Sequence, residues 1–183
     1  MESWYFAYGS NLWMDQMIER TDSIGHPEHG PRIARLANHR LVFQRLDAAD
    51  EAFANILCPG DGVLGVVYRC SQTDLERLDH YEGGYERRSI TVTDQHGEVL
   101  AAVAYFLIPA QAAITGRPTA AYLERIVGGA RQHGFPEEYI RNIAAIADSA
   151  ILRGDHSEQF DCCSNEEFQT PTDSQVGGGN SGG

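Results

Sequence analysis

The sequence predicts an α+β domain built on a curved mixed or antiparallel sheet, or a small barrel, with flanking helices. Strand-like apolar segments dominate the first two thirds of the chain, and short turns join most of them. Helical segments are concentrated toward the C-terminal end. Short connections between strands disfavour repeated strand–helix–strand units. The length of 183 residues fits one such domain with its own core, plus a tail.

The N-terminal half begins with a strand, Trp4–Tyr8, that ends in the turn-forming tripeptide Gly-Ser-Asn. A helix is predicted over Leu12–Arg20, because its apolar residues recur at helical spacing behind Asn11, a residue type that caps helices. The next apolar segments are bounded by polar or Pro/Gly-containing turns, which is typical of strands. They predict strands over Arg40–Leu46, Ala52–Leu57 and Val63–Cys70.

The second half opens with a helix signal, Ser71 followed three residues later by Asp74, ahead of leucines on one face. Tyr85–Asp94 and Val99–Leu107 then read as two strands of a hairpin, joined by the turn Asp-Gln-His-Gly. Two helices complete the domain, the first stopped by a glycine and the second started after a proline. Their predicted ranges are Ala120–His133 and Glu137–Ala147.

Composition excludes several classes of partner and chemistry. The formal net charge is −12, and the 14 basic residues are all Arg. Such a chain offers no cationic cluster for nucleic acid and no lysine for Schiff-base or Walker-type chemistry. It shows neither a secretory-signal pattern nor an apolar run of membrane-spanning length. We therefore expect no nucleic-acid partner, no membrane partner and a cytoplasmic location.

Residues 154–183 are predicted to be a disordered tail outside a catalytic domain of residues 1–153. The segment contains six acidic residues and no Lys or Arg, and it ends in Val-Gly-Gly-Gly-Asn-Ser-Gly-Gly. Such a composition cannot bury enough apolar surface to offset the entropy lost on ordering. Half of the formal net charge lies in this tail.

Three features of the sequence suggest other kinds of site, but each lacks the context that such a site requires. Gly60–Gly65 matches G-x-G-x-x-G, but strand-like residues follow it where a dinucleotide site needs a helix. His26 and His29 lie among prolines and glycines with no evident third ligand, which favours solvated loop histidines over a metal site. Ser10 lacks the G-x-S-x-G context of a hydrolase nucleophile. We expect neither a metal nor a cofactor.

Two segments point to chemistry. In the first, Tyr8–Leu12, a strand ends in Gly-Ser-Asn and enters a helix, so that successive backbone N–H groups can hold an anion or a developing oxyanion. An ordinary capped turn explains this segment equally well. In the second, Glu82 lies where a helix ends, between Tyr81 and a Gly-Gly pair. Aromatic neighbours would desolvate the carboxylate and raise its pKa, which suits proton transfer near neutral pH. Taken in isolation, a glutamate at this place is more often an ordinary solvated residue at the end of a helix.

Together these segments resemble the γ-glutamyl cyclotransferase superfamily, which also includes γ-glutamylamine cyclotransferases and AIG2-like proteins. The YGSNL-type loop of that family matches Tyr8–Leu12, and its LDxxEG-type segment matches Leu78–Gly83. Further similarity occurs at Gly62–Tyr68 and Ala130–Tyr139. The resemblance spans roughly residues 3–147 and implies the γ-glutamyl cyclotransferase-like fold.

The resemblance implies an enzyme that converts a γ-glutamyl amide to 5-oxoproline and a free amine, without metal, cofactor or protein nucleophile. Glu82 would carry a proton from the substrate ammonium to the leaving amine. The glutamyl part, or its oxyanion, would be held by backbone N–H groups of the opening loop, and tyrosines would line the pocket. The implied substrate-binding residues are Tyr8, Gly9, Ser10, Asn11, Leu12, Tyr85 and Tyr139.

Substrate and assembly stay open at this stage. Gly84–Arg88 is closer to the γ-glutamylamine and AIG2-like proteins, whereas the two C-terminal helices are closer to the enzymes of γ-glutamyl amino acids. Glutathione-specific relatives of the ChaC type are a third possibility. The alternative function is a catalytically silent relative that binds a small glutamyl or amine metabolite. The family contains monomers and homodimers, so either assembly is compatible with the sequence.

Overall fold

A computed structural model of the chain describes residues 2–22, 30–46, 51–108 and 112–149. The tail predicted for residues 154–183, the domain boundary at residue 153 and the loop histidines His26 and His29 lie outside the described residues. None of the helices among the described residues combines the length and the apolar composition needed to cross a membrane.

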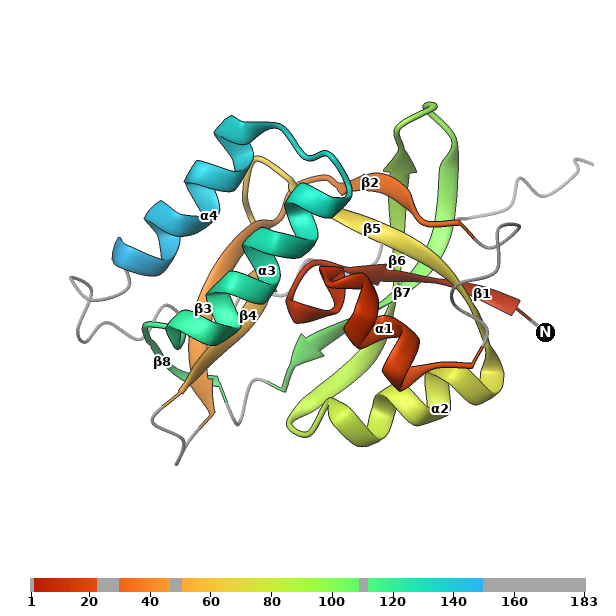
Figure 1. Cartoon of the computed structure of the whole chain (residues 1–183), viewed down its shortest axis with the longest axis horizontal. Helices are drawn as coiled ribbons and strands as arrows, with labels where there is room; N and C mark the ends of the chain where they lie inside the picture. Colours follow the sequence, from red (N-terminus) through yellow and green to blue (C-terminus); the bar gives the residue numbers. More distant parts are fainter. Residues whose placement is uncertain (1, 23–29, 47–50, 109–111, 150–183) are drawn as a thin grey trace, which may run out of the picture.

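A closed barrel forms the centre of the molecule (Figure 1), with strands in the order β1-β5-β2-β6-β7. Neighbouring strands are antiparallel except β1 and β7, which pair in parallel and close the barrel. The α+β class and the mixed-sheet or small-barrel prediction are thus confirmed. The barrel strands are β1 (Glu2–Ala7), β2 (Arg32–Leu36), β5 (Val63–Ser71), β6 (Tyr85–Asp94) and β7 (Val99–Leu107).

A three-stranded antiparallel sheet lies beside the barrel and is built from β3 (Arg40–Leu46), β4 (Ala52–Leu57) and β8 (Ala112–Thr115). Helix α3 (Ala120–Gln132) packs against the turn at Ser10–Leu12 and lies beside this sheet in Figure 1. Helix α4 (Glu137–Ser149) follows α3 and contacts β3. The hydrophobic core is continuous through both sheets and these helices.

Two further helices, α1 and α2, lie below β1 in Figure 1. The predicted helix over Leu12–Arg20 is instead a 3₁₀ turn, Ser10–Leu12, followed by α1 (Met14–Arg20), with Trp13 in an extended conformation between them. Helix α2 (Gln72–Tyr81) begins at the capping box expected for Ser71 and Asp74, whose side chains each accept from the backbone N–H of the other. This helix leads directly to Glu82.

Strands β2 and β8 were not predicted. Each is short, and each is made a strand by partners that are distant in sequence: β2 pairs with β5 and β6, and β8 pairs with β3. The G-x-G-x-x-G match at Gly60–Gly65 runs into β5, as expected for a strand rather than a phosphate-binding helix.

Candidate active site

Glu82 lies at the turn between α2 and β6. It is the C-cap residue of α2: its N–H donates to the carbonyl oxygen of Leu78 (3.2 Å), and its own carbonyl oxygen accepts from the N–H of Tyr85 (3.0 Å). Gly84 within this turn has φ of +86°, a left-handed conformation that glycine adopts without steric cost. The side chain of Glu82 turns inward and is only 17% exposed.

The carboxylate of Glu82 is in direct contact with the N-terminal segment of the chain. Its Oε1 accepts a hydrogen bond from Nδ2 of Asn11 (2.9 Å), and the same nitrogen donates to the hydroxyl of Tyr5 (2.7 Å). Arg20 Nη1 lies 3.8 Å from Oε1. The structure therefore brings together Glu82 and the Tyr8–Leu12 segment, which are the two parts of the chain that the sequence singles out.

Burial raises the pKa of Glu82 above its ordinary value of 4.5, because water no longer solvates the charged form. The positive charge of Arg20 and the hydrogen bond from Asn11 act against this and lower the pKa, whereas the charge of Asp79 raises it further. The net effect is a raised pKa, which brings the carboxyl group closer to the range in which it can both accept and return a proton near neutral pH.

The aromatic residues around Glu82 come from distant parts of the chain rather than from its sequence neighbour. Tyr81 is 56% exposed and lies outside the buried site. Five buried or half-buried tyrosines lie close enough to Glu82 for its charge to raise their pKa. They are Tyr5, Tyr8, Tyr85, Tyr105 and Tyr122.

The Tyr8–Leu12 segment is held in place at both ends. The Tyr8 hydroxyl donates to the backbone carbonyl of Tyr105 in β7, and the Leu12 carbonyl accepts from Nε2 of His133 (3.0 Å). The Leu12 N–H donates to the Gly9 carbonyl (3.0 Å) within the 3₁₀ turn. The N–H of Leu12 is therefore used inside the turn, whereas the sequence led us to expect that it would bind the ligand. The side chain of Leu12 is part of the hydrophobic core.

Tyr85 and Tyr122 meet on the backbone of Ala54 in β4. The Tyr85 hydroxyl donates to the Ala54 carbonyl (2.8 Å), and the Ala54 N–H donates to the Tyr122 hydroxyl (3.2 Å). Burial raises the pKa of Tyr122 to about 12, although hydrogen bonds from Ala54 and Ser10 lower it. A Cβ atom on Gly9 would lie 3.3 Å from this hydroxyl. Tyr122 thus lies against the Gly9–Ser10 backbone, at the place where the sequence predicts substrate contacts.

Four residues near Glu82 were not predicted from the sequence: Tyr122, Tyr5, Tyr105 and Arg20. Tyr122 is the third residue of α3 and stands in no motif, so its role depends on the packing of α3 against the start of the chain. The tyrosines of β1 and β7 form part of ordinary strand patterns. Their ring centroids lie 5.7 Å apart in an edge-to-face arrangement, which a single sequence does not reveal.

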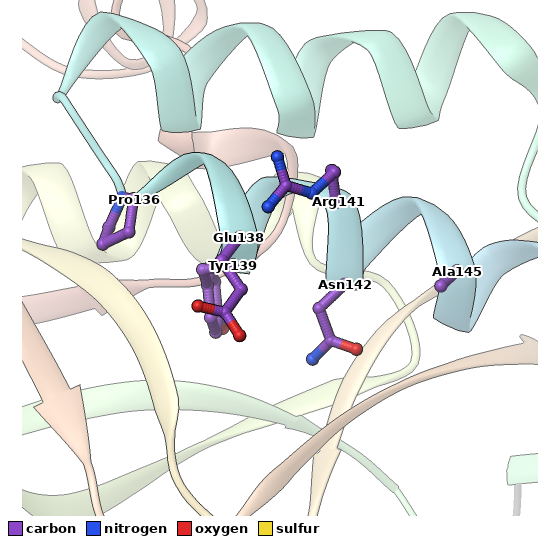
Figure 2. Close-up of a pocket in the computed structure, with 6 residues that line it drawn as sticks. All are labelled: Pro136, Glu138, Tyr139, Arg141, Asn142 and Ala145. Atoms are coloured by element: carbon purple, nitrogen blue, oxygen red, sulfur yellow. The ribbon is translucent and has the colours of Figure 1, made fainter.

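The structure does not bring Tyr139 into this group. Its hydroxyl accepts from the Leu64 N–H (2.9 Å) and donates to the Leu64 carbonyl (3.2 Å), which fastens α4 to β5. Tyr139 lines a surface hollow of about 640 Å³ along α4 (Figure 2), and α4 and α2 lie on opposite sides of the molecule in Figure 1. The other lining residues are Pro136, Glu138, Arg141, Asn142 and Ala145.

The raised pKa of Glu82 predicts a pH-dependent effect of Glu82→Gln on stability. The folded state holds a proton on Glu82 to higher pH than the unfolded state, so ionisation destabilises the fold as pH rises above about 4.5. Gln removes this penalty. We expect the gain in the free energy of unfolding to be absent below that pH, to grow through the folded-state pKa and then to level off. Urea unfolding across this range measures it.

The matched control for this experiment is Glu76→Gln, a change to an exposed residue of the same helix. It removes the same charge from a solvent-exposed position, and so separates the burial of Glu82 from the simple loss of one carboxylate. A Glu82→Gln effect that is independent of pH, or that becomes destabilising as pH rises, would contradict a raised folded-state pKa.

Among the described residues, His, Cys, Asp and Glu side chains form no group of three or more that could hold a metal ion. Residues 62–143, which include β5, Glu82 and all of α3, match the sequence profile of the AIG2-like family. The chain is 30% identical over 152 residues to the γ-glutamylcyclotransferase of Mus musculus, covering 78% of this chain and 77% of the mouse protein.

Two further comparisons agree. The γ-glutamylcyclotransferase of Homo sapiens is 29% identical over 176 residues, covering 91% of this chain and 90% of the human protein. A solved structure of a γ-glutamyl cyclotransferase superposes with a TM-score of 0.70 at 27% identity, covering 87% of this chain and 94% of that one. Fold, site and sequence similarity all lead to one assignment: the chain belongs to the γ-glutamylcyclotransferase family, within the superfamily that includes the AIG2-like proteins.

Proposed function

We propose that this protein converts a γ-glutamyl amide to 5-oxoproline and a free amine, with Glu82 as the group that transfers the proton. The observation that carries the proposal is the buried carboxylate of Glu82, which accepts a hydrogen bond from Asn11 in the Tyr8–Leu12 segment. The γ-glutamylcyclotransferase relatives support the reaction class.

The reaction needs no external nucleophile, because the substrate carries one. A γ-glutamyl amide can fold so that its own α-amine nitrogen reaches its γ-carbonyl carbon in a five-membered ring. Glu82 takes a proton from the α-ammonium group, and the freed amine forms the new C–N bond. The old amide C–N bond then breaks, and the departing nitrogen receives the proton from Glu82. The attacking nitrogen gives up its second proton, so that the ring closes to a neutral lactam and the amine leaves as an ammonium ion. Holding the substrate in the attack-ready shape supplies much of the rate enhancement by proximity.

Negative charge develops on the γ-carbonyl oxygen while the ring closes. The backbone N–H groups of Gly9, Ser10 and Asn11 are the donors that we assign to this oxygen or to the glutamyl carboxylate. The tyrosines around Glu82, including the buried Tyr8 and the half-buried Tyr85, lower the local dielectric, and donors that are already oriented act more strongly there than in water.

A substrate panel tests the proposal. The protein is incubated separately with γ-glutamyl-alanine, γ-glutamyl-ε-lysine and glutathione, and released 5-oxoproline is quantified. We expect 5-oxoproline from at least one of them and a clear preference among the three, because the site must also accommodate the leaving amine. The preferred compound then distinguishes a γ-glutamyl amino acid enzyme from a γ-glutamylamine enzyme.

The same panel separates the enzyme from a silent binding protein. Binding of a glutamyl compound or an amine by calorimetry, with no 5-oxoproline released from any of the three, would contradict the proposal and favour the binder. The presence of a buried carboxylate with a raised pKa favours the enzyme, since a binding module has no need of a group that can exchange a proton.

A further inference from the structure

The side chain of Asn11 lies between Glu82 and Arg20. Oδ1 of Asn11 accepts from Arg20 Nη1 (2.8 Å) and from Gln16 Nε2 (2.9 Å). A guanidinium group has donors and no acceptor, so the amide oxygen of Asn11 must face it and the amide nitrogen must face away. That nitrogen then points at Glu82. Gln16 alone could not impose this orientation of Asn11, because the Gln16 amide can turn to present either its oxygen or its nitrogen. The guanidinium group of Arg20 presents donors in every orientation.

Arg20 is itself held close to the carboxylate by a second contact. It is the last residue of α1, and its guanidinium carbon lies 4.5 Å from the ring centroid of Tyr81, the last residue of α2. Through this cation–π contact the exposed ring of Tyr81 helps to hold the guanidinium group of Arg20 near Glu82. The side chain of Arg20 is 21% exposed, so it lies between the solvent and the buried Asn11–Glu82 pair.

Arg20 is the cation that acts on Glu82 among the groups around it. Asp79 on the same helix has the opposite effect, and its carboxylate pairs with Nε of Arg87 on β6 (2.9 Å). The remaining titratable neighbours are tyrosines whose pKa burial raises, so that they stay neutral at physiological pH. They are Tyr5 on β1, Tyr8 after it, Tyr85 on β6, Tyr105 on β7 and Tyr122 on α3.

We propose that Arg20 is a positioning residue for the cyclisation: it fixes the amide of Asn11 and favours the charged form of the buried Glu82, which is the form that takes a proton. Burial alone would favour the protonated acid, which cannot act as the base. Since Oε1 receives the Asn11 hydrogen bond and lies near Arg20, we assign the transferred proton to Oε2. This inference rests on the proposed function, but the effect of Arg20 on the charge of Glu82 can be measured without turnover.

The test compares Arg20→Met, which removes the charge and the donors, with Arg20→Lys, which keeps the charge. The first measurement is a carboxyl-¹³C NMR titration of Glu82, which requires no activity. In Arg20→Met we expect Glu82 to titrate about one pH unit higher than in the wild type, and in Arg20→Lys we expect most of that difference to disappear. The matched control is Arg125→Met, which removes an exposed cation from α3.

The second measurement is the pH dependence of kcat and KM for the γ-glutamyl compound that the wild type turns over. The acid limb of kcat/KM should move up by about one pH unit in Arg20→Met, with kcat about tenfold lower below neutral pH and largely recovered at alkaline pH. KM should change less than about threefold, because a positioning residue does not contact the substrate. Arg20→Lys should restore the position of the limb.

The outcomes separate the inference from the proposed function. An unchanged Glu82 titration in Arg20→Met overturns the role of Arg20 whether or not the protein is an enzyme. An effect on KM alone overturns it as well, because Arg20 would then bind substrate. If no compound releases 5-oxoproline but Glu82 titrates higher without Arg20, the proposed function fails and the electrostatic role stands. If Arg20→Met does not fold, Arg20→Gln takes its place: a Glu82 titration that moves to higher pH supports the inference, and an unchanged one opposes it.

Discussion

Glu82→Gln is expected to lower kcat for 5-oxoproline formation by about 10²- to 10⁴-fold, the range typical of a lost general acid–base group. Gln keeps the length of the side chain and an oxygen that can accept from Nδ2 of Asn11. It cannot take the ammonium proton or return it to the leaving amine. KM should change little, because the backbone donors of the Tyr8–Leu12 segment are unaffected. Steady-state kinetics with the preferred substrate measures both constants.

Glu76→Gln is the control for this experiment. It removes one negative charge from the exposed face of the same helix and should leave kcat within about twofold, in the range of a neutral surface change. Retention of wild-type turnover by a folded Glu82→Gln protein would exclude Glu82 as the proton carrier, even though the family assignment would stand.

Gly129→Ala is expected to lower the free energy of unfolding by about 1–3 kcal/mol, the usual cost of overpacking. Helix propensity alone would favour Ala by about 1 kcal/mol, so the sign of the effect tests packing. A Cβ atom at this position in α3 would lie 2.4 Å from the carbonyl carbon of Leu12 and 2.6 Å from the backbone nitrogen of Trp13. Backbone atoms cannot rotate away, so α3 or the 3₁₀ turn must move.

Gly129→Ala should also reduce catalysis, because Leu12 ends the segment that we assign to substrate binding. A displacement of about 1 Å there could lower kcat/KM by about 10²-fold. Urea unfolding and kinetics on the same protein measure the two effects. Ala145→Gly in the exposed face of α4 is the control: it should cost about 1 kcal/mol by propensity and leave kcat/KM unchanged. A stabilised and fully active Gly129→Ala protein would contradict the packing argument.

Local chemistry was sufficient to predict many of the elements. The hairpin of β6 and β7 was predicted with the bounds that the structure shows, because strand-forming residues flank a turn that is encoded within a few residues. The start of α2 followed in the same way from Ser71 and Asp74. Strand β2 could not be found by such means, since it is a five-residue segment whose ladder is formed with β5 and β6.

The same division holds for the site. The sequence alone identified Glu82 and the Tyr8–Leu12 segment, because each combines a reactive or donor group with a local break in regular structure. It did not identify Tyr122, and it included Tyr139, whose hydroxyl is hydrogen-bonded to the backbone of Leu64 in β5 instead. Both tyrosines lie in amphipathic helices, and only the packing of α3 and α4 decides which ring reaches the Glu82 side of the molecule.

The sequence by itself determined the strands with local turns, the helix starts and the carboxylate that ends α2. The tertiary structure alone decided that Asn11, 71 residues away, donates to that carboxylate and that Arg20 lies beside it. The physical reason is that barrel closure, through the parallel pairing of β1 with β7, brings together the ends of elements that share no local sequence signal. Burial and electrostatic balance, and with them the pKa of Glu82, exist only after that closure.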